Sequence, residues 1–138
     1  MKNLKLIFLV LLSVFPFCMM GQQQVSVSQL NGTRWRLPNS TSGSTYEYTS
    51  THRIWRRNGN LMFRYPYYLS NTIVSSFDKS KVGKNTKGCY LVIYNEKLNF
   101  TYCSLIIELD KQKGTIKCKL ETKGIIGCGD VYTCELIK

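Results

Sequence analysis

The stretch HRIWRRNGNLMFRYPYYL, residues 52–69, has the pattern of two β-strands joined by a tight turn. Asn58-Gly59 separates two runs rich in aromatic and branched side chains, and both turn residues accept the positive φ of a two-residue hairpin. The register that such a turn imposes gives three cross-strand pairs: Ile54 with Phe63, Trp55 with Met62, and Arg53 with Arg64. The stretch therefore predicts a β-hairpin.

A second hairpin is indicated by IIELDKQKGTIKCKLE, residues 106–121, whose turn falls in residues 110–114. In its second strand Ile116, Cys118 and Leu120 alternate with Lys117, Lys119 and Glu121. This alternation is typical of a strand with one face in a core and the other in water.

Working outward from these hairpins, we expect an all-β fold, because no helical period is sustained after residue 21. The predicted strands are 31–37, 45–57, 60–68, 71–77, 88–95, 99–109, 114–122 and 130–137. Consecutive strands with short links favour a single up-and-down antiparallel barrel of about eight strands. An immunoglobulin-type sandwich is disfavoured, because Trp35 and Trp55 precede every cysteine of the region after residue 21.

The first 21 residues have the features of a cleaved signal peptide. Lys2 and Lys5 precede an apolar run over residues 6–17 that is too short to span a bilayer. Lipidation at Cys18 is disfavoured because Phe15 and Phe17 occupy places that such processing reserves for aliphatic and small residues. We therefore expect an exported, periplasmic or secreted protein with one domain over residues 22–138 and no transmembrane segment in that domain.

The predicted mature chain is strongly basic. Residues 22–138 hold 17 of the 19 Lys and Arg residues and all eight acidic ones, a formal net charge of +9. This excess favours an anionic surface or an acidic protein as partner. Nucleic acid is the disfavoured partner, because exported proteins are often basic without binding it.

The cysteines are expected to be structural. An exported chain can keep disulfides, so we predict one or two bridges and at least one free thiol among five cysteines: Cys89, Cys103, Cys118, Cys128 and Cys134. No C-x-x-C pair occurs and His52 is the only histidine, which disfavours a metal site and a Cys–His nucleophile. We predict no catalytic residues, no metal and no cofactor.

One short string carries a family resemblance. LNGTRWRL, residues 30–37, resembles the opening strand of lipocalin-like (calycin) barrels, and the layout is similar to that of small secreted lipocalin-like proteins of Bacteroidetes-type bacteria. The same string also resembles the opening of META-type domains. The lipocalin resemblance implies a barrel with one open end and an apolar cavity, in which Gly32 and Trp35 close the other end.

These observations lead to two functional hypotheses. The first is an exported, non-enzymatic protein that binds a small apolar or amphiphilic ligand in the barrel. The expected ligand contacts are Trp55, Phe63, Tyr65, Tyr67 and Tyr90. A basic rim that favours anionic head groups is expected from Arg53, Arg56, Arg57, Arg64, Lys79, Lys81, Lys84 and Lys87. The alternative is an interaction protein, of the inhibitor, immunity or polyanion-binding type, that acts through its basic outer surface.

Overall fold

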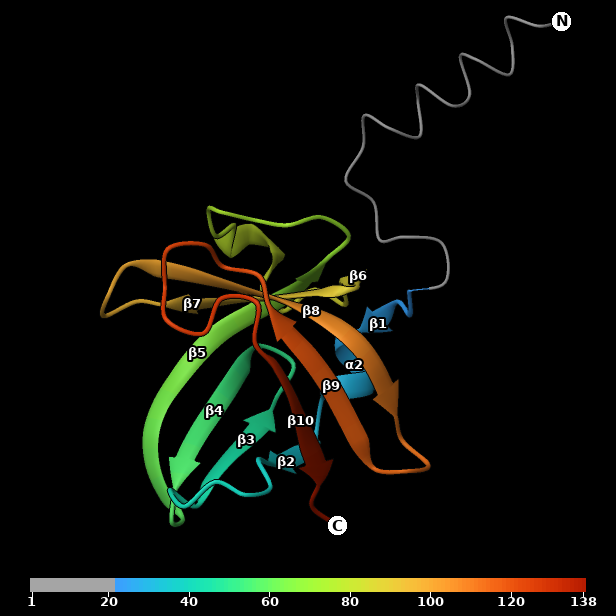
Figure 1. The fold of residues 1–138 in the computed structure, drawn as a ribbon. Helices are drawn as coiled ribbons and strands as arrows, with labels where there is room; N and C mark the ends of the chain where they lie inside the picture. Colours follow the sequence, from blue (N-terminus) through green and yellow to red (C-terminus); the bar gives the residue numbers. More distant parts are fainter. Residues whose placement is uncertain (1–21) are drawn as a thin grey trace, which may run out of the picture.

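The protein is a closed barrel of eight antiparallel strands (Figure 1), which confirms the predicted fold class. The computed structural model describes residues 22–138, so the predicted signal peptide and Cys18 lie outside the described residues. The barrel strands are β2 (Arg34–Arg36), β3 (Ser44–Tyr48), β4 (His52–Arg57), β5 (Asn60–Ser70), β7 (Tyr90–Asn95), β8 (Phe100–Asp110), β9 (Thr115–Leu120) and β10 (Val131–Leu136). Each strand pairs with its neighbour in sequence, and β10 closes the barrel on β2 through the pair Leu136 and Trp35.

Three short elements lie outside the barrel sheet. Strand β1 (Val25–Ser26) pairs with β6 (Lys87–Gly88), and the one-turn helix α2 (Val27–Leu30) leads into β2. The 3₁₀ turn η1 (Lys79–Lys81) lies in the long connection between β5 and β7. Among residues 22–138 no helix is long and apolar enough to cross a membrane.

Two predicted strands were wrong, although the number of barrel strands is as expected. The predicted strand 45–57 is divided into β3 and β4 by a turn at residues 49–51. Thr49 makes this turn, because its hydroxyl accepts hydrogen bonds from the backbone N–H groups of Thr51 (3.2 Å) and His52 (2.9 Å). The predicted strand 71–77 is an irregular segment that packs against the outside of the barrel.

The β4–β5 hairpin has the expected turn but a different register. Asn58 (φ 49°) and Gly59 (φ 80°) form the two-residue turn, and Arg57 pairs with Asn60. The register then shifts between Trp55 and Arg56, so that two residues of β4 oppose three of β5 and Met62 is the extra residue. This β-bulge replaces the predicted pairs by Trp55 with Phe63, Ile54 with Arg64, and Arg53 with Tyr65.

The bulge decides which side chains face the barrel interior. Side chains alternate between the two faces of a strand, and the observed register places Phe63 and Tyr65 on the same face as Trp55 and Arg53. Arg64 and Ile54 consequently face outward. In a regular register without the bulge, Met62 would be opposite Trp55, and Phe63 and Tyr65 would face outward with Ile54.

One end of the barrel is filled with side chains. Trp35 is 1% exposed and packs in the main core together with Leu30 of α2, Tyr48 and Tyr67. The rings of Tyr48 and Tyr67 meet edge to face with their centroids 5.4 Å apart. The indole N–H of Trp35 donates to the Thr33 hydroxyl at 2.8 Å, so burial leaves no unpaired polar group on this side chain. We call this half of the barrel the filled half.

Gly32 lies at the entry to the filled half. Its φ of 80° lies in the left-handed region that favours glycine. Its N–H donates to the carbonyl of Tyr48 at 2.8 Å, which ties the segment before β2 to the end of β3. Gly32 and Trp35 therefore both lie at the filled end of the barrel.

Candidate ligand site in the open half of the barrel

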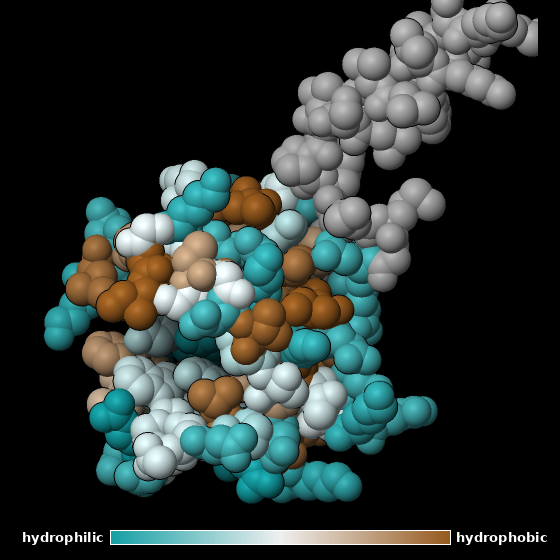
Figure 2. Space-filling model, viewed as in Figure 1, coloured by the Kyte–Doolittle hydropathy of each residue, from teal (hydrophilic) through white to brown (hydrophobic). Residues whose placement is uncertain are grey.

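The other half of the barrel is lined by side chains but is not filled by them. Four connections surround it: residues 37–43, 58–59, 96–99 and 121–130. A cavity of about 530 Å³ lies inside this end. Its lining includes Leu37, Tyr46, Arg53, Ile93, Tyr102, Leu120, Asp130 and Tyr132. We call this half the open half; it faces the left of Figure 1, and Figure 2 shows a hollow left of the centre in the same view.

The β4–β5 wall of the open half carries a row of stacked aromatic rings. The centroids of Trp55 and Phe63 are 5.9 Å apart with planes inclined by 17°, and those of Phe63 and Tyr65 are 5.7 Å apart with planes inclined by 26°. The indole N–H of Trp55 donates to the Ser44 hydroxyl at 3.1 Å. All three rings remain partly exposed although they face the interior. We call these three residues the aromatic row.

Three cations lie over aromatic rings of this half. The guanidinium of Arg57 is 5.3 Å from the Trp55 ring centroid, and the ammonium of Lys97 is 5.9 Å from that of Phe63. Both cations belong to residues next to turns at the rim. Arg53 lies deeper, with its guanidinium 4.6 Å from the centroid of Tyr46 and 5.8 Å from that of Tyr65. Each distance is within the range at which a ring face attracts a cation.

Arg53 is the most unusual of the three cations. Its Nε is buried and has no hydrogen-bond partner. Burial lowers the pKa of Arg53, but the nearby hydroxyls of Tyr48, Tyr132 and Tyr46 outweigh burial and the pKa remains raised. Burial also raises the pKa of Tyr48, and that of Tyr132 rises well above its ordinary value for the same reason. At neutral pH the group is therefore a charged guanidinium among uncharged phenols.

The predicted ligand contacts are only partly brought together. Trp55, Phe63 and Tyr65 lie on the inner face of the open half together with Arg53, although they are not among the residues that line the cavity. Tyr67 belongs to the filled half, where it is 1% exposed and its hydroxyl donates to the carbonyl of Thr49 at 2.7 Å. Tyr90 packs on the outer face of the barrel against Cys103 and Val92. Placing Tyr67 and Tyr90 at the cavity was therefore wrong, because the first is buried in packing and the second points outward.

Sequence reasoning missed three tyrosines of the cavity lining: Tyr46, Tyr102 and Tyr132. A signal for them exists in the alternation of their strands. Tyr46 is opposite Trp55, Tyr102 is opposite Ile93, and Tyr132 is opposite Cys118. Each therefore shares the interior face with a residue that is already recognisable as apolar.

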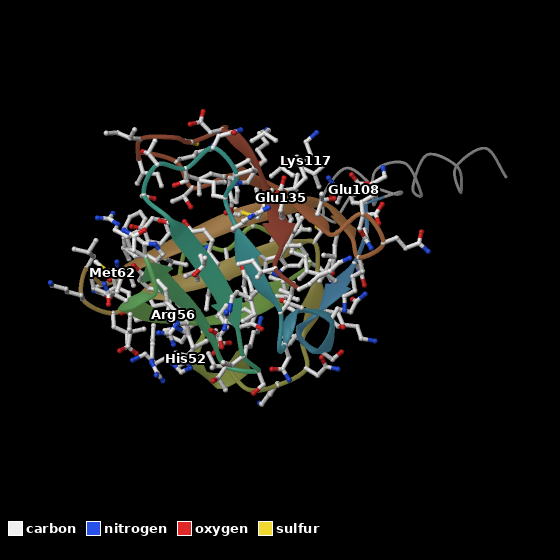
Figure 3. All side chains as sticks on the ribbon, turned by 90° about the horizontal axis from the view of Figure 1, so that it is seen from below. His52, Arg56, Met62, Glu108, Lys117 and Glu135 are labelled. Carbon is white, nitrogen blue, oxygen red and sulfur yellow. The ribbon has the colours of Figure 1, made fainter. Side chains whose placement is uncertain are left out.

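The predicted basic residues do not form one rim. Arg57 lies near the rim and Arg53 is inside the barrel. Arg56 points outward and its Nε is 3.8 Å from a carboxylate oxygen of Glu47, while Arg64 is exposed on the same outer face. Figure 3 shows Arg56 well apart from Glu108 and Lys117, which lie toward the other side of the view.

The four lysines of the predicted rim belong to another part of the surface. Lys79, Lys81, Lys84 and Lys87 lie on the connection between β5 and β7, which crosses the outside of the barrel. This connection is fixed by Phe77, whose ring centroid is 5.0 Å from those of Tyr68 and Tyr94. The lysines are thus held on an outer face, because the segment that carries them has its own apolar anchor.

The predicted disulfides among the five cysteines after residue 21 are not formed. Cys103, Cys118, Cys128 and Cys134 have free thiols, so no bridge joins any of the five to another. Burial raises the pKa of Cys118 to about 12 and that of Cys134 to about 11, and these thiols are packed core groups. Among residues 22–138 no three His, Cys, Asp or Glu side chains gather as a metal site would require.

No family model, curated protein or solved structure matches the chain. The eight-stranded antiparallel barrel is compatible with a lipocalin-like fold.

Proposed function

We propose that this protein is an exported, lipocalin-like, non-enzymatic binding protein that holds a small amphiphilic ligand in the open half of its barrel. The observation that carries the proposal is the unfilled interior at this end. Tyr46, Tyr102 and Tyr132 line about 530 Å³ of space together with Arg53, and the aromatic row lies on the same inner face of the β4–β5 hairpin as Arg53. An eight-stranded barrel is just wide enough to be filled by side chains or to hold one small ligand.

The energetics of the open half favour an occupant. Aromatic surface that faces a cavity gains about 25 cal/mol for each Å² that a ligand removes from water. The closed sheet already holds this wall in place, so a ligand meets a largely preformed site and little ordering opposes binding. The mixture of apolar walls with Arg53 and tyrosine hydroxyls suits a ligand that has an apolar body and a polar end.

Native mass spectrometry tests the proposal. Residues 22–138, purified from an exporting host, are measured before and after extraction with organic solvent. We expect an additional discrete mass that extraction removes. A bare protein mass, together with no uptake of added fatty acids or hydrophobic dyes, would contradict the proposal.

Two tryptophan substitutions provide a matched control. Leu120→Trp places a large ring at the cavity lining and is expected to abolish the additional mass. Leu61→Trp adds the same ring at a residue that is 48% exposed and pairs with the outward-facing Arg56. The Leu61→Trp variant should keep the additional mass. If this variant loses the additional mass, the binding site lies outside the barrel.

A second candidate function is suggested by the outer face. A hollow of about 600 Å³ lies between the β5–β7 connection and strands β7 and β8, and it is lined by Phe77, Tyr94, Cys103, Lys79 and Lys123 among others. The four lysines of the connection form none of the ion pairs found in residues 22–138. This surface suits an acidic macromolecule, in keeping with the basic net charge.

The second candidate has a separate readout. Retention on immobilised heparin should fall when Lys79, Lys81, Lys84 and Lys87 are all replaced by Gln, and it should also fall with added salt because exposed charges are screened. Replacing Arg64 and Lys117 by Gln is the control, because it removes exposed positive charge from other faces of the barrel. This control variant should be retained nearly as well as the unmodified protein. Equal retention of the lysine variant and the unmodified protein would exclude a role for this surface in polyanion binding.

A further inference from the structure

The cavity of the open half contains a cation that nothing in the described chain neutralises. Arg53 forms none of the ion pairs found among residues 22–138, and its buried Nε has no hydrogen-bond partner. Asp130, the acidic residue of the cavity lining, does not pair with it. Arg53 as a whole is partly exposed, but a buried N–H donor without a partner, on a charged group without an ion pair, is unfavourable for folding, so this arrangement needs an explanation.

The immediate surroundings of Arg53 do not supply a counter-charge. The rings of Tyr46 and Tyr65 offer only their faces, at 4.6 and 5.8 Å. Tyr48 accepts a hydrogen bond from the guanidinium, but burial keeps its hydroxyl uncharged at neutral pH. These contacts orient the guanidinium and leave part of its donor capacity unused.

We propose that Arg53 recognises the carboxylate of a ligand whose body is a flat, apolar ring system. This inference rests on the proposed function and names the class of its ligand. The guanidinium carries one positive charge and presents parallel N–H donors, which match the single charge and the two oxygens of a carboxylate. A carboxylate there would satisfy the orphaned Nε and neutralise the charge in one step.

The aromatic row indicates the shape of the ligand body. Neighbouring rings of Trp55, Phe63 and Tyr65 are inclined by 17° and 26°, and all three lie on the inner face that carries Arg53. The wall runs along β4 and β5 from the Asn58-Gly59 turn at the rim to Tyr65, the cross-strand partner of Arg53. A planar ligand ring adds stacking to the area it buries, beyond what an aliphatic chain of equal area gains.

Two probes that differ only at the polar end test this assignment. 1-Pyrenebutanoic acid and 1-pyrenebutanol share a flat fluorescent ring, and only the first carries a carboxylate at neutral pH. Dissociation constants of both are measured by fluorescence titration of residues 22–138. We expect the acid to bind about ten- to a hundredfold more tightly, the range that hydrogen bonds to a charged group give.

Matched arginine variants separate Arg53 from the net charge. Arg53→Met keeps much of the length of the side chain and removes the charge, so the acid should lose its advantage while the alcohol binds as before. Arg64→Met removes one charge from the outer face of the same hairpin and should leave both affinities unchanged. Arg53→Lys keeps the charge but removes the paired N–H donors of the guanidinium, so it should give an intermediate preference for the acid.

Each outcome has a distinct meaning. If neither probe binds the unmodified protein, this inference fails, whereas the proposed function fails only if the native mass spectrum also shows a bare protein that takes up no fatty acid or dye. If both probes bind with equal affinity, or if Arg53→Met retains the preference for the acid, the cavity binds ligands but Arg53 does not recognise their carboxylate. If the Arg53→Met variant does not fold, the ratio of the dissociation constants of the alcohol and the acid for the unmodified protein still shows whether the cavity recognises a carboxylate.

Discussion

The two halves of this barrel are built from the same strands but are completed in different ways. In the filled half the interior is occupied by Trp35, Tyr48, Tyr67 and the apolar side chains that α2 brings to the barrel end. In the open half the aromatic row is partly exposed on the inner face, a cavity remains beside Arg53, and the Nε of Arg53 has no hydrogen-bond partner. The filled half stabilises the fold, and this allows the open half to keep a surface that packing alone would not favour.

The comparison predicts a large difference in the contribution of the two tryptophans to stability. Trp35→Ala removes a fully buried ring from the filled half and should lower the free energy of unfolding by about 3–5 kcal/mol. Trp55→Ala removes a partly exposed ring from the open half and should cost about 1 kcal/mol or less. Urea denaturation of both variants measures the difference. Equal costs would mean that the two halves are packed alike.

Substitutions at two glycines extend the comparison, with smaller expected losses of stability than Trp35→Ala. A Cβ at Gly88 would lie 2.0 Å from the backbone oxygen of Ser70, so Gly88→Ala should destabilise the protein by about 1–3 kcal/mol. Gly124 lies in the connection at the open end, where a Cβ would meet no atom within 4 Å. Because its φ is 82°, Gly124→Ala should still cost up to about 1 kcal/mol. Thermal denaturation compares the two variants. A larger loss of stability in Gly124→Ala than in Gly88→Ala would contradict this prediction.

The buried thiols of the filled half predict a loss of stability at alkaline pH. Burial raises the pKa of Cys118 to about 12 from 9.0, so the unfolded chain loses the thiol proton at a lower pH than the folded protein. The stability from this group is complete below about pH 9 and falls as the pH rises, by up to about 1.4 kcal/mol per pH unit.

The measurement is chemical denaturation at several pH values between about 8 and 9.5, below the ordinary pKa of tyrosine. Cys118→Ala should flatten the decline, whereas Cys128→Ser, at an exposed thiol, should leave it unchanged. If the slope is the same in all three proteins, Cys118 is not a protonated core thiol.

The architecture was largely predictable from the sequence because its signals are local. Asn58-Gly59 specifies a turn by its own backbone preference, and Ile116, Cys118 and Leu120 mark an inner face by alternation alone. The turn at Thr49–Thr51 was missed because the residues that form it also favour strands. Its hydrogen bonds depend on the Thr49 hydroxyl and become visible only in the folded chain.

The candidate site was less predictable because it depends on one extra residue. Met62 shifts the register of β5, and this shift brings Phe63 and Tyr65 to the inner face and turns Arg64 outward. Sequence reasoning therefore placed Arg53 opposite Arg64 at a rim, whereas the fold places it inside the barrel beside Tyr65 and Tyr46. A bulge reflects packing between strands, for which the local sequence carries little signal.

The most direct test of the central claim uses the two tryptophans of the chain, one in each half. The protein is labelled with 5-fluorotryptophan and its ¹⁹F NMR spectrum is recorded during titration with 1-pyrenebutanoic acid, with Trp55→Phe used for assignment. The resonance of Trp55 should move with added ligand while that of Trp35 stays in place. Binding that leaves Trp55 unmoved, or that moves Trp35 alone, would contradict the assignment of the ligand site to the open half.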